Sequence, residues 1–362
     1  MADLAQRYAA VADEQRGLAR PVVRELTRAG FSRHFVPTEH GGAAGGFVGL
    51  VDAVVELGQS CASAAWCGML FAAHGRLASY LPEPARRELW DGSPDTLIAA
   101  GVAQPVHEAR PVPGGYLLSG DWPTVSGVSF ADWVLTTAWT PGARGREARL
   151  FLVPADGCTV VDTWDPPGMR GTGSNTVLLD EAFVPEYRTV LRDRLLTCDG
   201  ASGGARCHSV PFPFVAALMF AAPVVGAAHG VLAAWTLRAA TSSGPDGLPF
   251  ARHPAAATAL GRASAELRAA RLLLGAVAGR ADTADVDPLA VAENRRDSAA
   301  AVEMCVAATD RLAAAGGPDA PCADDPVHRG RRDVRTAAGH AMLRFDPSAA
   351  AYAEAVVGAA AG

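Results

Sequence analysis

The chain contains no lysine, so arginine supplies all 32 of its Lys-plus-Arg cations. Acidic side chains outnumber them, and the formal net charge at pH 7 is -6. Domains that bind nucleic acid are usually basic, with their cations gathered on one face. The composition therefore argues against a nucleic-acid partner, although the segment RRDVRTAAGH (331–340) contains three arginines.

Cysteine is present but follows no pattern: seven residues are scattered along the chain without a CxxC pair. An odd, irregularly spaced set predicts neither a disulfide framework nor a metal site. The N-terminal residues lack the apolar core of a signal peptide. A membrane span needs about 18 consecutive apolar residues, and each apolar run here is interrupted by charge, glycine or proline. We therefore expect a cytoplasmic protein that does not cross a membrane.

A nicotinamide-binding fingerprint is also missing. The segment GMRGTGSN contains a GxG, but the residues after it, NTVLLDEAF, have the composition of a strand. A dinucleotide-binding loop follows a strand and opens a helix, so this segment is interpreted as a β-turn. If NAD(P)H reduces a cofactor used by this chain, we expect a separate protein to carry out that step.

The chain does contain three segments with different hydrophobic periods, and 49% apolar residues provide for a sizeable core. Residues 1–97 carry apolar side chains at spacings of three and four, which predicts helices. Residues 98–191 hold short runs rich in Val, Leu, Thr and aromatics, typical of an antiparallel barrel or sandwich. A long loop is predicted at 192–213, and alanine-rich helices of a bundle at 214–362. The fold class is α+β.

This order of helices, strands and helices is uncommon, and several segments strengthen a resemblance. FVPTEHGGAAGG, GGYLLSGDWPTVSGVSFADWVL and GMRGTGSNTVLLDEAFVPEYRTV resemble the acyl-CoA dehydrogenase fold. That fold has an N-terminal helical domain, a middle β-barrel and a C-terminal four-helix bundle. AAWCGMLFAAH and HRGRRDVRTAAGH are more similar to the two-component flavin-dependent monooxygenases built on it (group D). The resemblance covers nearly the whole chain.

The resemblance implies an activity. Such an enzyme takes reduced FMN or FAD from a partner NAD(P)H flavin reductase and reacts it with O2. The resulting C4a-(hydro)peroxyflavin oxygenates a small substrate, here an aromatic or polyketide-like phenol first and an amino sugar second. A homotetramer is expected, and the apolar C-terminus AYAEAVVGAAAG suits a subunit contact.

Two other classes stay open. An acyl-CoA dehydrogenase or related oxidase would hold FAD and use a glutamate base, usually in a YEG-type motif of the C-terminal bundle. The glutamates after residue 260 lack that context; they are Glu266, Glu293, Glu303 and Glu354. A scaffold homologue that binds no flavin is the non-enzymatic alternative.

Ser126 and Gly127 are the first candidate site residues. A Ser–Gly pair at a strand end lets the backbone approach a flat ligand, because glycine has no side chain. The serine hydroxyl can both donate and accept. The resemblance places Ser126 near flavin N5, whereas an isolated Ser–Gly would be an ordinary turn.

His340 is the second candidate. If 331–343 is helical, Asp333, Thr336 and His340 lie near one stripe, so Asp333 or Thr336 would orient the imidazole. Histidine exchanges protons near neutral pH. The resemblance implies that His340 faces the flavin C4a edge and either stabilises the peroxide or deprotonates a phenol. The alternative is a surface histidine beside an Arg/Asp pair.

Five further residues are weaker candidates. His74 and Trp66 are expected to line a substrate pocket, or else to fill the core. Trp122 is assigned to the flavin or to the barrel core. Gln104 begins a loop that lies over the flavin in relatives. Arg252 precedes a helical run and would grip the flavin phosphate, from a neighbouring subunit if necessary, or else lie on the surface.

The loop after Gln104 departs from the family pattern. Relatives often have P-x-G-x-A here, whereas this chain has PVHEA at 105–109. The added bulk and charge put the usual role of the loop in doubt. His107 and Glu108 are interpreted as a local surface pair, with an altered substrate contact as the alternative.

Overall fold

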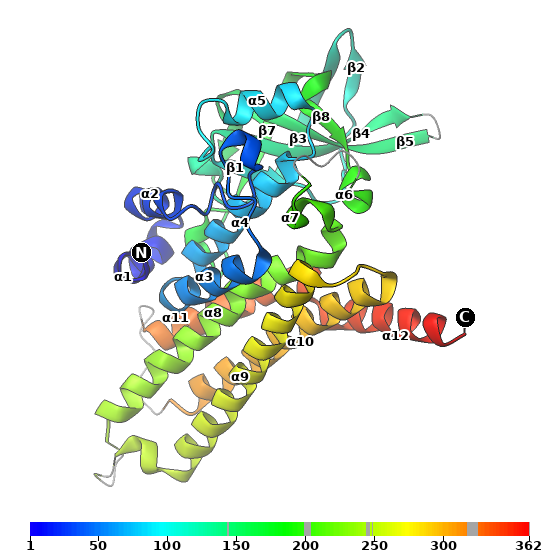
Figure 1. The fold of residues 1–362 in the computed structure, drawn as a ribbon. Coiled ribbons are helices and arrows are strands. Elements are labelled where there is room, and N and C mark those ends of the chain that lie inside the picture. The colour runs from blue at the N-terminus through cyan, green and yellow to red at the C-terminus, as the bar shows by residue number, and fades with distance from the viewer. Residues whose placement is uncertain (143–144, 199–203, 244–246, 248, 317–324, 362) are drawn as a thin grey trace.

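The structure is a computed structural model that describes residues 1–142, 145–198, 204–243, 247, 249–316 and 325–361. Helices come first, strands occupy the middle of the chain, and long helices follow (Figure 1). This is the α+β order that the hydrophobic periods predicted. Short 3-10 turns connect the elements: η1 Thr38–His40, η2 Val128–Phe130, η3 Ala155–Gly157, η4 Arg170–Thr172, η5 Glu186–Arg188, η6 Phe250–Arg252 and η7 Ala341–Leu343.

The N-terminal part consists of five helices: α1 Ala2–Gln15, α2 Arg20–Arg28, α3 Phe47–Ser60, α4 Ala62–Ala78 and α5 Glu83–Trp90. Proline in the first turn opens α2 and α5, where its missing N–H costs no helical hydrogen bond. Every residue of α4 is buried, which fits a helix that is apolar on all sides. This central helix carries both Trp66 and His74.

The strands form two four-stranded sheets. One has the order β1 Ile98–Gly101, β4 Trp133–Gly142, β5 Gly145–Pro154 and β8 Thr189–Leu191. The other has the order β2 Arg110–Val112, β3 Gly115–Val125, β7 Asn175–Pro185 and β6 Thr159–Val161. The predicted antiparallel pairing is wrong for one pair: β1 and β4 are parallel, because the chain between them crosses to the second sheet and returns. Apolar side chains from both sheets share one core.

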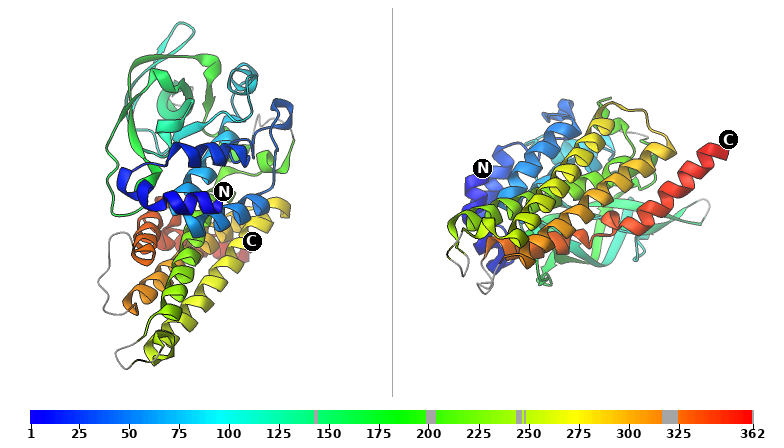
Figure 2. Two further views of the ribbon diagram at one scale, coloured as in Figure 1. Left: turned by 90° about the vertical axis from the view of Figure 1, so that its left-hand side faces the viewer. Right: turned by 90° about the horizontal axis from the view of Figure 1, so that it is seen from below.

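The C-terminal part is helical again, with α8 Phe212–Thr241, α9 Pro254–Thr283, α10 Pro288–Ala314, α11 Pro326–Ala338 and α12 Phe345–Ala361. The long helices lie side by side, and α12 projects along one edge (Figure 2). Among the described helices, α8 alone is long and apolar enough to cross a membrane, but 78% of that window is buried inside the protein. It is therefore the core helix of this bundle.

The predicted loop 192–213 holds two single-turn helices, α6 Arg194–Thr197 and α7 Arg206–Ser209; residues 199–203 of it lie outside the described part. The buried Arg76 of α4 fixes α7, since its guanidinium donates to the carbonyls of Cys207 (2.5 Å) and Val210. The loop thus connects sheet and bundle through a held segment.

Glycines allow α3 and α8 to cross in backbone contact. A Cβ on Gly226 would lie 2.5 Å from the Val55 carbonyl oxygen, and one on Gly230 would lie 2.3 Å from that of Gln59. Neither distance admits a side chain. The crossing therefore fixes the N-terminal helices against the bundle, and α4 contacts the first half of α8 through Trp66 and Phe220.

Candidate active site

Ser126 follows β3 directly and is 7% exposed. Gly127 has a φ of 70°, in the left-handed region that favours glycine. A Cβ at this position would lie 3.0 Å from the Phe71 ring. The glycine thus turns the strand end towards α4 and leaves the serine hydroxyl at the junction of sheet and helices.

A chain of hydroxyl groups continues from Ser126. Its Oγ lies 2.7 Å from Oγ of Ser174, which lies 2.7 Å from Oγ1 of Thr172. Thr172 donates to the Met169 carbonyl oxygen at 2.8 Å. On the other side, the Trp66 indole N–H donates to Ser126 at 3.2 Å. The three hydroxyls are buried, so each of them is satisfied within the protein.

His340 lies next to this group. Its ring stacks on Phe220 of α8 with 3.9 Å between ring centroids, and it meets Trp66 edge-on at 5.9 Å. The Met342 N–H donates to Nδ1 at 3.3 Å. Burial lowers the pKa of His340 to about 4, so the imidazole is neutral at pH 7. Ser126, Trp66 and His340, predicted from three distant segments, are thereby brought together.

The predicted helical stripe towards His340 is wrong. Helix α11 ends at Ala338, and Gly339 turns the chain out of it, with its N–H bound to the Thr336 carbonyl at 3.2 Å. The Asp333 carboxylate accepts from the Met169 N–H at 2.5 Å, so it binds the loop before β7 instead of the imidazole. Contacts with Phe220, Trp66 and Met342 orient the ring in place of Asp333 and Thr336.

Burial, with a smaller contribution from the Asp13 carboxylate, raises the pKa of Asp333 to about 7, against the bond from Met169 and the charges of Arg329 and Arg332, which lower it. A group with this pKa is partly protonated at neutral pH. Through its hydrogen bond with the Met169 N–H, the carboxyl links α11 to the loop that carries Thr172 and Ser174.

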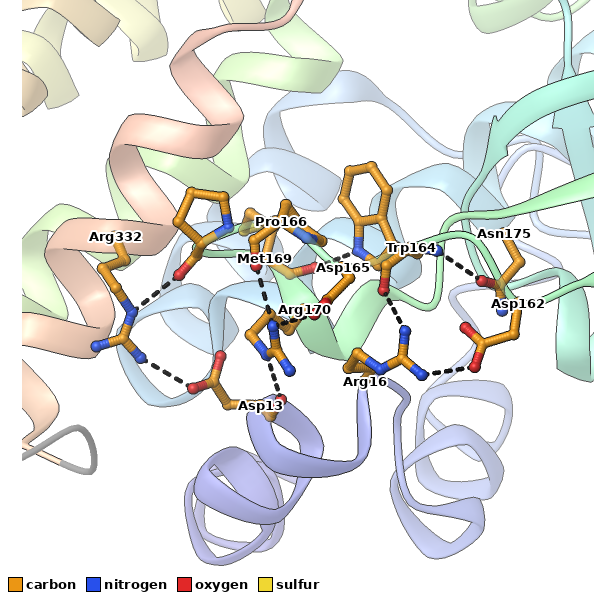
Figure 3. A network of polar contacts seen from close by, with 11 residues as sticks. Asp13, Arg16, Asp162, Trp164, Asp165, Pro166, Met169, Arg170, Asn175 and Arg332 are labelled. Atoms are coloured by element: carbon orange, nitrogen blue, oxygen red, sulfur yellow. Dashed lines mark hydrogen bonds and ion pairs between the residues drawn. The ribbon is translucent and has the colours of Figure 1, made fainter.

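Three arginines, of which only Arg332 belongs to this stretch, hold the junction between α11, α1 and the loop before β7 (Figure 3). Arg332 donates to the Pro167 carbonyl and to the Asp13 carboxylate of α1, both at 2.9 Å. Arg170 donates to the Asp13 carbonyl at 2.9 Å, while Arg16 binds the Trp164 carbonyl at 3.1 Å. Arg332 thus joins three parts of the chain, whereas Arg331 and Arg335 bind Asp310 of α10.

His74 and Trp122 have structural partners. His74 Nδ1 lies 2.7 Å from the Ile98 carbonyl oxygen, and burial lowers its pKa to about 4. It is 5% exposed. The Trp122 indole N–H donates to the Thr137 carbonyl at 2.8 Å, inside the core shared by the two sheets. The placement favours the core alternative for Trp122 over its assignment to the flavin.

The loop after β1 is exposed at Gln104, and the Trp139 indole fixes it through the Pro105 carbonyl at 2.8 Å. The predicted His107–Glu108 pair is wrong. His107 instead binds Asp121, with Nε2 2.8 Å from its carbonyl oxygen, and Glu108 faces Arg146 at 3.9 Å. Backbone alternation sends the two neighbouring side chains to opposite sides.

Arg252 is exposed in η6, between α8 and α9. Phe220 lies near the start of α8, whereas Phe250 of η6 packs on Trp235, about 15 helical residues or roughly 22 Å further along the helix. Within one chain, Arg252 is therefore remote from Ser126 and His340.

Sequence reasoning missed Thr172, Ser174 and Phe220. The segment GMRGTGSN was interpreted only as a turn, yet its two hydroxyl residues flank Gly173, whose φ is 51°. Two hydroxyls around a glycine, in a segment that resembles the acyl-CoA dehydrogenase fold, were the available signal. Phe220 offered none, since it stands among many apolar residues of α8.

Comparisons with known proteins identify the family of the chain. Residues 1–82 match the acyl-CoA dehydrogenase N-terminal domain, and residues 218–345 match its C-terminal domain. An FADH2-dependent resorcinol hydroxylase, oxygenase component, from Rhizobium sp. (strain MTP-10005) is 32% identical, covering 96% of this chain and 89% of that protein. A pigment production hydroxylase of Rhodococcus sp. (strain ATCC 21145) is 31% identical, covering 92% and 88%. The solved structure of XiaF from Streptomyces sp., in complex with FADH2 and glycerol, superposes with a TM-score of 0.92 at 27% identity, covering 99% and 93%.

Proposed function

The chain belongs to the flavin-dependent monooxygenases built on the acyl-CoA dehydrogenase fold, and on this basis we propose that it oxygenates a small phenol. It is the oxygenase component of a two-component enzyme that uses reduced flavin and O2. The observation that carries the proposal is the convergence of Ser126, Trp66 and His340 from β3, α4 and the end of α11.

The residues present fit a flavin ring. Trp66, Phe220 and His340 provide planar surfaces, and Ser126 provides a polar group held by two hydrogen bonds. Pockets that bind flat ligands are mainly apolar with a few placed polar groups. Bound reduced flavin would supply the activation of O2. We propose that Ser126 and Gly127 contact the ring near N5. The cofactor proposed is reduced FMN or reduced FAD.

His340 is proposed as a hydrogen-bond donor at the reacting oxygen. Because Nδ1 accepts from the Met342 N–H, the single proton of the neutral ring lies on Nε2. A low pKa keeps the ring in that form at neutral pH. The Nε2–H can donate to an oxygen atom, whereas deprotonation of a phenol would require Nε2 without its proton. The geometry thus favours stabilisation over general-base catalysis.

The substrate proposal rests on named relatives. Resorcinol and p-hydroxyphenylacetate are phenols that appear in the names of relatives 32% and 25% identical to this chain. His74 and Trp66 both belong to α4, about two turns apart. In this proposal, Trp66 contacts the substrate more directly, since His74 is occupied by Ile98.

A labelled-oxygen experiment tests the activity. The purified chain is mixed with chemically reduced FMN or FAD, ¹⁸O2 and resorcinol or p-hydroxyphenylacetate, with acyl-CoA in a parallel anaerobic reaction. One ¹⁸O atom in the phenolic product is expected, and the acyl-CoA should leave oxidised flavin unreduced. Flavin reduction by acyl-CoA, without labelled product from either phenol, would establish the dehydrogenase class instead.

We also propose a homotetramer in the cytoplasm. Helix α12 is largely exposed, with Val357 68% exposed, and an apolar surface of this kind suits contact with another copy. Arg252 would reach a flavin phosphate only from a second copy, given its distance from Phe220. Light scattering after size exclusion should give four chains per particle, and Arg252→Ala should weaken flavin binding without dissociating the particle.

A further inference from the structure

We propose that Thr172 and Ser174 are positioning residues that fix the direction of the Ser126 hydroxyl, and that this direction favours a flavin ring carrying a proton on N5. The inference rests on the proposed function, because it takes Ser126 as the residue facing N5. It adds two residues, and a reason for selecting reduced over oxidised cofactor.

The direction is determined first at Thr172. Its Oγ1 lies 2.8 Å from the Met169 carbonyl oxygen. A carbonyl oxygen only accepts, so the single hydroxyl proton of Thr172 is donated to Met169. The oxygen of Thr172 is then able only to accept from its second neighbour, Ser174.

The same reasoning applies in turn to the hydroxyls of Ser174 and Ser126. Ser174, 2.7 Å from Thr172, must donate its only proton to that oxygen. Ser126, 2.7 Å from Ser174, must in turn donate its own proton to Ser174. Thr172 is 2% exposed, Ser174 4% and Ser126 7%. Bulk water therefore offers no alternative acceptor at Thr172 or Ser174.

Trp66 completes the environment of Ser126. The indole N–H can only donate, and it lies 3.2 Å from the serine oxygen. Ser126 therefore donates to Ser174, accepts from Trp66 and keeps one lone pair. Towards any further neighbour, this hydroxyl is an acceptor and not a donor.

Met169, which accepts the first proton of this series of hydroxyls, is held through both its carbonyl and its N–H. The Met169 carbonyl also accepts from the Trp164 indole at 3.0 Å, and the Met169 N–H donates to Asp333 at 2.5 Å. Met169 adopts a φ of 56°, a conformation rare outside glycine that such contacts stabilise. The acceptor of the Thr172 proton is thus fixed in place.

An acceptor at this position distinguishes the two redox forms of a flavin. Reduced flavin carries a hydrogen on N5 and can donate it to Ser126. Oxidised flavin has an unprotonated N5, whose lone pair would face the lone pair of Ser126. The site therefore retains reduced flavin and releases the oxidised form, which suits an enzyme that exchanges flavin with a reductase.

The test compares dissociation constants of oxidised flavin and of anaerobically reduced flavin, measured for the purified chain with FMN and with FAD. In Thr172→Val, which conserves shape, Ser174 loses its acceptor and turns its proton to Ser126, so that Ser126 can donate to the ring. The ratio of the oxidised to the reduced constant should fall about tenfold, the effect of one ordinary hydrogen bond. The potential of the bound flavin should then fall by about 30 mV.

Three further variants make the result specific. Ser174→Ala frees the Ser126 proton and should change the ratio in the same direction, even if Thr172→Val folds poorly. Thr172→Ser keeps the hydroxyl and should restore the original ratio. Thr136→Val is the matched control, because its buried hydroxyl has no hydrogen-bond partner within the described part of the chain.

Two results would overturn the inference while leaving the proposed function intact. One is an unchanged ratio in Thr172→Val and Ser174→Ala. The other is an equal change when either variant is made in a Ser126→Ala background, since the effect would then bypass Ser126. If the unaltered chain binds neither form of flavin, the proposed function fails as well.

Discussion

His74 and His340 have the same lowered pKa, about 4, in different surroundings. His74 is enclosed between α4 and β1, and its Nδ1 lies 2.7 Å from the Ile98 carbonyl oxygen, to which it must donate. His340 follows α11, lies against Phe220 and accepts at Nδ1 from Met342. The two neutral rings therefore carry their protons on opposite nitrogens.

This difference shows that a shifted pKa does not by itself identify a catalytic histidine. Desolvation is the main cause for both residues. The two residues differ in which ring proton can reach a ligand. The Nδ1 proton of His74 is donated to the Ile98 carbonyl, whereas the proton of His340 lies on Nε2. The first arrangement stabilises the fold, and the second suits a reactant.

The largest expected effect is on catalysis at His340. His340→Ala removes the proposed donor, so oxygenated product per reduced flavin should fall about 100-fold, as for loss of a positioned proton donor, while hydrogen peroxide rises. Product and peroxide are measured together with the melting temperature. His74→Asn, which keeps a donor in the place of Nδ1, is the control. An unchanged product yield in His340→Ala would remove His340 from the reaction.

The next effect is on stability at His74. His74→Ala leaves the Ile98 carbonyl without its donor and creates a cavity, so the free energy of unfolding should fall by about 2–3 kcal/mol. His74→Asn should lose much less. Urea unfolding of both variants measures the difference. Equal losses would mean that the hydrogen bond to Ile98 contributes nothing beyond packing.

The third effect concerns pH. Unfolded histidine binds a proton below about 6.5, whereas buried His74 does so only below about 4. The unfolded state thus gains protons first as the pH falls, and stability is lost between pH 6.5 and 4. At pH 5 this amounts to about 2 kcal/mol for His74. Unfolding of the unaltered chain and of His74→Asn at pH 5 and pH 7 should show a smaller loss in the variant; parallel losses would contradict the assignment.

The smallest effect is expected at Arg332. It lies in the same basic stretch as His340 but binds Asp13 and Pro167 at the outer junction. Arg332→Gln should lower the free energy of unfolding by about 1 kcal/mol at most, as for a partly exposed ion pair. Product per reduced flavin should stay unchanged. A marked loss of product with little loss of stability would place Arg332 in the site after all.

Local pattern was sufficient for much of the fold. Periods of three to four residues predicted the helices, and short β-rich runs predicted the strands. The family resemblance brought Ser126 and His340 forward as site residues, and the structure places both beside Trp66.

Contacts between residues far apart in the sequence could not be predicted from local hydrophobic periods. Asp333 and Met169 are 164 residues apart, and no period links them, so the stripe argument assigned Asp333 to the nearer His340. The end of α11 at Gly339 was missed for a related reason, because the continuing alanine-rich pattern favoured a longer helix. The Thr172–Ser174 contact appears only once the turn is folded.

The backbone of Met169 has a mechanical consequence. Its N–H is held by α11 of the bundle and its C=O by Thr172 and Trp164 of the loop before β7. These two groups belong to the consecutive peptide units on either side of the Met169 Cα, and each unit is planar and stiff. A rigid-body rotation of bundle against sheets must therefore be absorbed by the φ and ψ of this one residue, whose φ of 56° already lies in a sparsely populated region, or one of the bonds must break. The relative orientation of the two parts is thereby coupled to the backbone conformation of a single residue.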